Sequence, residues 1–308
     1  MRMGAGAAAP AGMDLAGLLP WGGLAAAPPG EAGAVVAGIP YDGSAAYRRG
    51  AAQAPGRLRD LSRVMPPVDE RGRSLGVSVH DLGDLDLGPA VEEGWEAVAS
   101  RLSEVPPSAL LTVLGGDHCA TVPVLAAQAR RHPGLAVLWL DAHPDLCEVS
   151  RGGRWTCGCA LRRGLEVAGI PSAALVMAGA RDFDPEEVDW ITEQGVLMIP
   201  SADLAADPRG SAARIARAVG DRPLHVSFDI DVLDPAFAPG TEIPSAGGIS
   251  TRQALDALRA LSEAVPLVGL DVAEVAPPLD VGDITSLAAL KLVFEFWGMA
   301  WRPPTRSS

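Results

Sequence analysis

Two short acidic segments of this 308-residue chain carry side chains whose types and spacing suit metal binding. One segment contributes Asp229 and Asp231, and the other contributes Asp141, His143 and Asp145. Side chains two residues apart in an extended segment project from the same face. Because each segment follows an apolar run, we expect these groups to point together into one site.

A sixth candidate ligand is His118, which follows Gly115-Gly116-Asp117 after a third apolar run. The four aspartates would repel one another without a counter-charge, whereas two divalent cations would neutralise them. The donor set is rich in oxygen, which favours Mn²⁺ or a similar ion over structural zinc. Two such ions about 3.5 to 4 Å apart can share a bridging water and lower its pKa toward neutrality. The sequence therefore predicts a hydrolytic site with two Mn²⁺ ions per subunit.

Glu274 is the acidic residue that we assign to the substrate. It lies in Asp271-Val272-Ala273-Glu274-Val275, again after an apolar run. A carboxylate can pair through both oxygens with a planar cation such as a guanidinium. We therefore expect a small guanidino or amidino substrate.

The elements that must position these residues are apolar runs separated by helix-like stretches. The runs cover residues 34–40, 109–114, 135–140, 174–179, 196–199, 224–228 and 267–270. Runs of this kind are typical of parallel strands that are covered on both faces. All the candidate residues follow the carboxyl end of such a run, which is the edge where open parallel sheets bind ligands.

Two helices have clear sequence signals. Ser250 followed by Gln253 predicts a capping box at the start of one helix. The last helix, about residues 284–300, is apolar on most faces. We therefore expect it to be deeply packed or to form a subunit contact.

Composition bounds the class of protein. Net charge is −13 with no run of basic residues, so we expect neither a nucleic-acid nor a membrane partner. The four cysteines fall within residues 119–159, which is no disulfide framework and favours the cytoplasm. No signal peptide and no membrane-spanning segment are expected. We predict a flexible arm over residues 1–32, a single catalytic domain over 33–303 and a tail over 304–308.

The chain resembles the ureohydrolase family, which contains the arginases and agmatinases, over roughly residues 33–300. The resemblance rests on Gly38-Ile39-Pro40-Tyr41-Asp42-Gly43, Tyr47-Arg48-Arg49-Gly50, Gly115-Gly116-Asp117-His118, Asp141-Ala142-His143-Pro144-Asp145, the segment from Ser227 to Gly240, and Asp271-Val272-Ala273-Glu274-Val275. The opening segment and Pro277-Pro278-Leu279-Asp280 favour the agmatinase-like branch. The resemblance implies a three-layer α/β/α fold around a mostly parallel sheet of about eight strands. It also implies a homotrimer or homohexamer.

The resemblance also implies a ligand set and a reaction. One Mn²⁺ would be held by His118, Asp141, Asp145 and Asp229, and the other by Asp141, His143, Asp229 and Asp231. The hydroxide that bridges the two ions would attack the guanidinium carbon and release urea. Asp145, Cys157 and Glu274 are the candidate catalytic residues.

Cys157 departs from the family pattern. Cys157-Gly158 stands where most members have a His-Gly pair, whose histidine is thought to relay a proton to the leaving amine. A thiol is a weaker hydrogen-bond partner, with an ordinary pKa near 8.5. Cys157 is either a catalytic substitute or a small buried hydrophobic residue.

The residues expected near the substrate are also unusual. Glu242-Ile243 stands where relatives usually have Gly-Thr, which adds a second acid. Cys147 occupies a position where arginases use a polar side chain to hold the α-carboxylate, so arginine is not the expected substrate. Asp184 matches a residue that contacts an amino group. Glu274, Asp184 and Glu242 are therefore the candidate substrate-binding residues.

Three functions follow from this pattern. The first is a Mn²⁺-dependent amidinohydrolase of the agmatinase or guanidinoacid type, which releases urea. The second is a formimino-type hydrolase that releases formamide, since formimidoylglutamases also lack the relay histidine. The third is a catalytically weak paralogue that binds a guanidino ligand.

Overall fold

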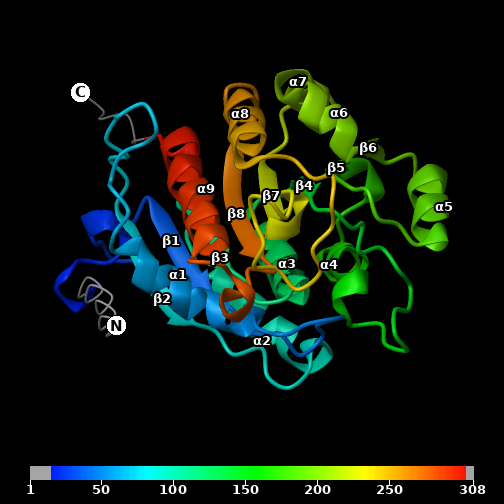
Figure 1. Cartoon of the computed structure of the whole chain (residues 1–308), viewed down its shortest axis with the longest axis horizontal. Helices are drawn as coiled ribbons and strands as arrows, with labels where there is room; N and C mark the ends of the chain where they lie inside the picture. Colours follow the sequence, from blue (N-terminus) through cyan, green and yellow to red (C-terminus); the bar gives the residue numbers. More distant parts are fainter. Residues whose placement is uncertain (1–14, 303–308) are drawn as a thin grey trace, which may run out of the picture.

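The computed structural model describes residues 15–302 and is built on one eight-stranded parallel sheet (Figure 1). The strand order is β2-β1-β3-β8-β7-β4-β5-β6. The strands are β1 (Ala34–Gly38), β2 (Val79–Asp84), β3 (Leu110–Leu114), β4 (Ala136–Leu140), β5 (Leu175–Ala178), β6 (Leu197–Ile199), β7 (Leu224–Asp229) and β8 (Leu267–Ala273). Every pairing between them is parallel. The predicted fold class is therefore confirmed.

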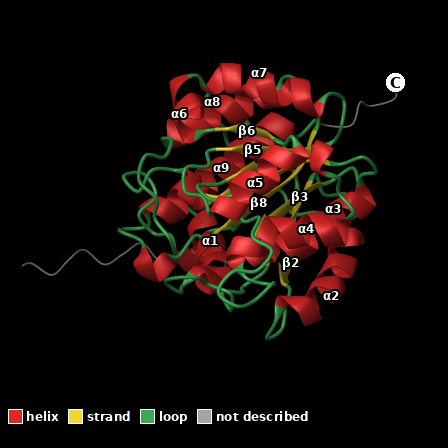
Figure 2. Ribbon diagram, turned by 90° about the vertical axis from the view of Figure 1, so that its right-hand side faces the viewer, coloured by secondary structure: helices red, strands yellow, loops and turns green. Residues whose placement is uncertain are grey.

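Helices cover both faces of the sheet, so the domain has three layers (Figure 2). One face packs against α1 (Ala54–Ser62), α6 (Ser201–Ala206), α7 (Pro208–Val219), α8 (Thr251–Ser262) and α9 (Ile284–Ala300). The other face packs against α2 (Val91–Ser103), α3 (Thr121–Arg131), α4 (Ala160–Ala168) and α5 (Pro185–Gln194).

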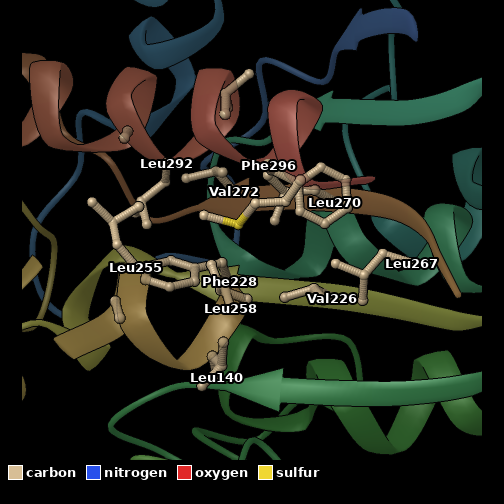
Figure 3. Close-up of a cluster of buried hydrophobic side chains, with 14 of the residues drawn as sticks. Leu140, Val226, Phe228, Leu255, Leu258, Leu267, Leu270, Val272, Leu292 and Phe296 are labelled. Atoms are coloured by element: carbon tan, nitrogen blue, oxygen red, sulfur yellow. The ribbon is translucent and has the colours of Figure 1, made fainter. Parts of the chain in front are cut away.

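Alternate side chains of each central strand enter opposite cores, as the two-residue period of a strand requires. In β4, Leu138 joins the core beneath α8 and α9, whereas Trp139 joins the core beneath α3 and α4. Figure 3 shows the first of these cores, where Phe296 of α9 lies near Leu270 of β8. Burial on both faces explains why these strands read as continuous apolar runs.

The expected helix signals are present. Ser250 and Gln253 form the capping box of α8. The last helix runs from Ile284 to Ala300 and is buried along most of its length. Over residues 15–302, no helix is both long and apolar enough to span a membrane.

Two strands differ from the sequence prediction. The edge strand β2 was missed because its sequence, VHDLGD, is polar and partly exposed. Strand β8 continues past residue 270 through Asp271, which is buried yet accepts hydrogen bonds from Thr121 and Ser227. A charged residue can lie inside a parallel strand when its oxygens are satisfied in this way.

Part of the segment that we predict as a flexible arm, residues 1–32, packs against the domain. Trp21 is only 4% exposed, and its backbone nitrogen donates to Ser62 Oγ at 2.9 Å. Its ring packs edge-on against Trp297, with centroids 5.7 Å apart, and Ala26 bridges to Val79. One large aromatic ring buries enough apolar area to anchor this segment. The first fourteen residues of the predicted arm and the predicted tail over 304–308 lie outside the described residues.

Candidate metal centre and substrate cavity

The candidate site residues gather at the carboxyl edge of four adjacent strands. His118 follows β3, Asp141 follows β4, Asp229 ends β7 and Glu274 follows β8. The sheet order places these strands side by side as β3-β8-β7-β4. Residues that are up to 156 positions apart in the chain therefore meet in one place.

The turn after β3 sets the position of His118. A Cβ atom on Gly116 would lie 1.9 Å from the backbone oxygen of Tyr41, so only glycine fits there. Asp117 then caps the short 3₁₀ helix His118–Ala120 by accepting from Cys119 N, and it also accepts from Ser44. The ring of His118 stacks on Trp139, with centroids 3.9 Å apart.

Three aspartates share one hydrogen-bonding pattern. In each of them Oδ1 accepts a hydrogen bond from a backbone N–H. Asp141 accepts from His143 N (2.6 Å), Asp229 accepts from Asp231 N (2.8 Å) and Asp231 accepts from Ala142 N (3.1 Å). In each of them Oδ2 faces an imidazole Nδ1. These oxygens lie 2.9 Å (Asp141) and 3.1 Å (Asp229) from His118, and 3.1 Å (Asp231) from His143. One oxygen orients each carboxylate and the other is left for a ligand.

The Nδ1 atom of His118 is the clearest sign that this site binds a cation. It lies 3.3 Å from Asp145 Oδ2 in addition to the two contacts above, but it makes no hydrogen bond although it is fully buried. Asp141 Oδ2 is buried and unpartnered in the same way. Burial of polar atoms without a partner costs free energy unless a ligand or ion binds them. Divalent cations therefore fit this set of residues.

A chain of hydrogen bonds behind the site orients the ring of His118. Its Nε2 lies 3.0 Å from Ser227 Oγ, and Ser227 in turn donates to Asp271. Because Ser227 donates its proton to Asp271, its oxygen can accept a hydrogen bond from Nε2 of His118, and Nδ1 is left facing the aspartates. Asp271 is held on its other side by His225, at 2.6 Å. A supporting shell of this kind is typical of metal-binding histidines.

The electrostatics of the cluster also require positive charge. Burial, together with Asp231 and Asp141, raises the pKa of Asp229 well above its usual range. Burial and Asp141 raise the pKa of Asp145 to about 7. Burial lowers the pKa of His143, but its contacts with Asp141 and Asp231 outweigh this and raise it to about 12. In the absence of metal the cluster retains protons, which divalent cations would replace.

Two site residues adopt backbone conformations that are costly for side chains other than glycine. Asp145 has φ of 55° and Glu274 has φ of 63°. Glu274 is held there because its backbone N donates to Gly116 O and its Oε1 accepts from His118 N, both at 2.8 Å. Strain of about 1 kcal/mol or more at each position is typical of functional sites.

A cavity of about 810 Å³ adjoins the cluster. Its wall includes the predicted ligands His143, Asp145, Asp229 and Asp231, together with Glu274 and Cys157. His118 and Asp141 are buried at 1% exposure. The six predicted ligands are therefore brought together beside a space large enough for a small molecule.

The rim of the cavity is acidic. The acids that line it are Asp182, Asp184, Glu186 and Glu187, of which all but Glu187 are exposed. Glu187 caps α5 by accepting from Asp184 N at 2.9 Å. Sequence reasoning selected only Asp184 from this group, although the run DFDPEE that follows Arg181 carries the signal. Arg151 is the cation among the lining residues.

Two unusual residues occupy different places. Cys157 lines the cavity at 8% exposure, and burial with Glu274 and Asp145 raises the pKa of its thiol. Glu242 lies behind the wall, at 1% exposure, while its neighbour Ile243 lines the cavity. The structure therefore does not favour the predicted direct contact between Glu242 and substrate.

Comparison with known proteins gives consistent matches over most of the chain. A profile of the Arginase family matches residues 32–298. Proclavaminate amidinohydrolase from Streptomyces clavuligerus is 38% identical over 266 residues, which cover 84% of this chain and 85% of that protein. Guanidinopropionase from Pseudomonas aeruginosa is 34% identical, covering 88% and 87%. Agmatinase from Bacillus cereus is 32% identical, covering 86% and 91%.

Structural comparison agrees with these matches. The solved structure of the Streptomyces clavuligerus proclavaminate amidinohydrolase superimposes with a TM-score of 0.84 at 35% identity. It covers 94% of this chain and 99% of that one. With its parallel sheet, its cluster of histidines and aspartates and these relatives, the chain belongs to the arginase family.

Proposed function

We propose that this protein is a dimanganese hydrolase that releases urea from a guanidino compound. The observation that carries the proposal is the arrangement around the two histidines. Three aspartates each present one free oxygen to an imidazole Nδ1, and His118 Nδ1 is buried without a hydrogen bond. As a member of the arginase family, the chain is a hydrolase of carbon–nitrogen bonds in linear amidines.

The six predicted ligands would hold the metal ions. The family resemblance implies that His118 and Asp145 would hold one ion, that His143 and Asp231 would hold the other, and that Asp141 and Asp229 would contribute to both. Oxygen-rich donors favour Mn²⁺. When bound, two such ions supply Lewis-acid chemistry, which lowers the pKa of water and polarises the substrate.

The remaining residues bind the substrate and handle protons. Glu274 lines the cavity and has one oxygen committed to His118 N, so the other is available to an N–H of the guanidinium. Asp145 is a proposed metal ligand that also lines the cavity, and it is assigned the transfer of a proton to the leaving group. Cys157 faces the same space as a protonated thiol, which is only a weak donor.

The acidic rim supports a substrate with a second, remote cation. Asp182, Asp184 and Glu186 place negative charge around the opening, opposed there by Arg151. Such a rim favours a guanidinoalkylamine over the guanidinoalkanoate of equal length. The comparison of these two compounds on the same enzyme is the direct measurement.

The test of the reaction uses the full chain loaded with Mn²⁺ and a panel of guanidino and formimino compounds. Urea, formamide and ammonia are read separately, and bound metal is counted by mass spectrometry. Urea with about two Mn²⁺ per subunit is the expected result, whereas formamide would identify the formimino-type reaction instead. Full metal occupancy without any product would overturn the proposal and favour a ligand-binding paralogue.

Asp229→Ala is the variant that links metal to activity. Because Asp229 faces His118 and is a proposed shared ligand, we expect bound metal to fall to one ion or fewer per subunit. Urea release should fall by at least about 100-fold, the upper end of what loss of an outer-shell partner costs. Asp189→Ala, at an exposed position on α5, is the matched control and should keep both properties.

Replacing Cys157 by histidine distinguishes two hypotheses, a specialised enzyme that uses the thiol and a weak enzyme that lacks a proton relay. If the thiol serves this enzyme's own substrate, Cys157→His should lower turnover. A sharp rise in urea release would instead show that the proton relay was missing. Metal content should be the same in both proteins.

Assembly and location complete the proposal. We propose a homotrimer or homohexamer, which sedimentation of the full chain would measure. A cytoplasmic location stays a prediction from the cysteine pattern, and fractionation of cells tests it.

A further inference from the structure

Three apolar side chains face the substrate cavity, and together we name them the apolar wall. They are Val149, which is 51% exposed, Phe183, which is 37% exposed, and Ile243, which is half-buried. All three lie outside the two hydrophobic cores of the described chain. Single exposed apolar residues are common on protein surfaces, whereas several around one cavity indicate a binding surface.

Val149 and Phe183 lie on two segments that are joined by a hydrogen bond. Cys147, two residues before Val149, donates from Sγ to Asp184 Oδ2 at 3.4 Å. The backbone N–H groups of the two residues before Phe183 both donate to Ala142 O, at 2.9 and 3.1 Å. The two apolar side chains therefore line the cavity from neighbouring segments whose backbones are fixed.

Ile243 lies on a third segment, which is fixed to the second. Ser245 Oγ donates to Asp182 Oδ2 at 2.6 Å, and the Arg181 guanidinium donates to Ser245 O at 2.8 Å. Phe183 directly follows these two residues in the chain. Segments that are fixed in this way lose little conformational freedom when a ligand binds, which favours affinity. The apolar wall is therefore formed before any substrate enters.

The size of the cavity indicates what covers the apolar wall. Its volume of about 810 Å³ lies within the range that holds drug-sized ligands. A linear guanidinoalkylamine is much smaller, so it would leave Val149 and Phe183 largely in contact with water. A ring or a branch on the carbon chain would cover these side chains, and burial of apolar surface favours binding.

We propose that the apolar wall determines specificity, and that the substrate is a guanidino compound whose carbon chain carries an apolar ring or branch. The inference rests on the proposed function and deepens it, because it describes the substrate beyond the guanidinium that is assigned to Glu274. Both Glu274 and the apolar wall line the same cavity, so one molecule can contact both. Apolar pockets discriminate by about 10-fold or more for each methylene-sized group that they cover.

Two substrates and three variants test this role in the Mn²⁺-loaded full chain. The substrates are a linear guanidinoalkylamine and an analogue of equal length whose chain carries a phenyl group. The wild type should prefer the phenyl analogue by about 10-fold or more in kcat/KM, mainly through KM. Phe183→Ala should remove most of this preference, whereas Phe183→Leu, which keeps apolar area, should keep it within about threefold. Val188→Ala, at an exposed apolar position of α5 outside the cavity lining, is the control.

Binding calorimetry with the same two compounds measures the contact without turnover. Equal affinity and equal kcat/KM of the wild type for both compounds would overturn the inference while leaving urea release in place. If the wild type binds the phenyl analogue more tightly but releases no urea, the inference stands and the proposed reaction fails. Absence of both binding and turnover overturns both.

Two further outcomes would assign Phe183 a different role and overturn the inference. If Phe183→Leu loses as much preference as Phe183→Ala, the ring acts through its π face on a cation and not through its apolar area. If Phe183→Ala changes sedimentation but not the preference, the ring belongs to a subunit contact. Metal content and thermal unfolding of each variant are measured to show that the fold and the cluster are intact.

Discussion

At the scale of single residues, the site depends on groups that orient the ligands as much as on the ligands themselves. Ser227 is fully buried and accepts from His118 Nε2 while it donates to Asp271. These hydrogen bonds hold the His118 ring with Nδ1 toward the aspartates. Outer groups of this kind typically contribute 10- to 100-fold to metal affinity.

Replacing Ser227 by alanine should therefore weaken metal binding. We expect Ser227→Ala to lower the affinity for Mn²⁺ by about 10-fold or more, because Nε2 then loses its acceptor and the ring loses its fixed orientation. Titration of the metal against a competing chelator measures this directly. Ser172→Ala, in a partly exposed 3₁₀ turn outside the site, is the control. Equal affinities of Ser227→Ala and the wild type would contradict a supporting role.

At the scale of elements, the acidic residues that begin α5 also lie at the cavity rim. Asp184 is its N-cap residue, and Glu186 and Glu187 lie in its first turn. Acidic residues stabilise the start of a helix because they interact with its N–H groups and dipole. The same residues line the cavity, so the start of this helix also sets the charge beside the site.

The two roles of Asp184 can be separated by asparagine, which is an equally good N-cap residue without the charge. We expect Asp184→Asn to leave thermal unfolding nearly unchanged. It should raise KM for a guanidinoalkylamine by several fold and leave the guanidinoalkanoate of equal length unaffected or improved. An unchanged ratio of kcat/KM for the two compounds would remove Asp184 from substrate selection.

At the scale of the whole molecule, a partly buried network of ion pairs connects the loop before β2 with α8 and α9. Glu70, in the loop before β2, pairs with Arg252 and Arg259 of α8, and Arg259 also pairs with Glu295 of α9 at 2.8 Å. The hydrogen bond with Arg252 is the largest influence that lowers the pKa of Glu70, to about 2. Its depressed pKa means that folding favours the ionised form.

This network predicts a pH-dependent loss of stability. Since the folded pKa of Glu70 is below its unfolded value of 4.5, its contribution is present above about pH 4.5 and is lost as the pH falls toward 2. At pH 7, Glu70→Gln should cost on the order of 2 kcal/mol, allowing for solvent screening of the exposed Arg252. The difference in Tm between wild type and variant should shrink as the pH falls, whereas Glu193→Gln, at an exposed position, should show no difference at any pH.

Local patterns in the sequence predict the parallel sheet and the grouping of the candidate ligands at its edge. Runs such as residues 135–140 are apolar because both faces of their strand are buried, and Asp141 and Asp229 follow such runs because ligands bind at that edge. These patterns are local, so they can be read along the chain. Strand β2 was missed because an edge strand is only partly buried and need not be apolar.

The residues that surround the candidate ligands are known only from the tertiary structure. The bridge between Thr241 and Val275, the hydrogen bond between His118 and Ser227 and the packing of Trp21 on Trp297 all join segments that are distant in the chain. The free energy of a buried carboxyl depends on which partner it meets, and the sequence does not state that partner. The kind of chemistry therefore followed from local spacing, whereas the roles of the supporting residues followed from the fold.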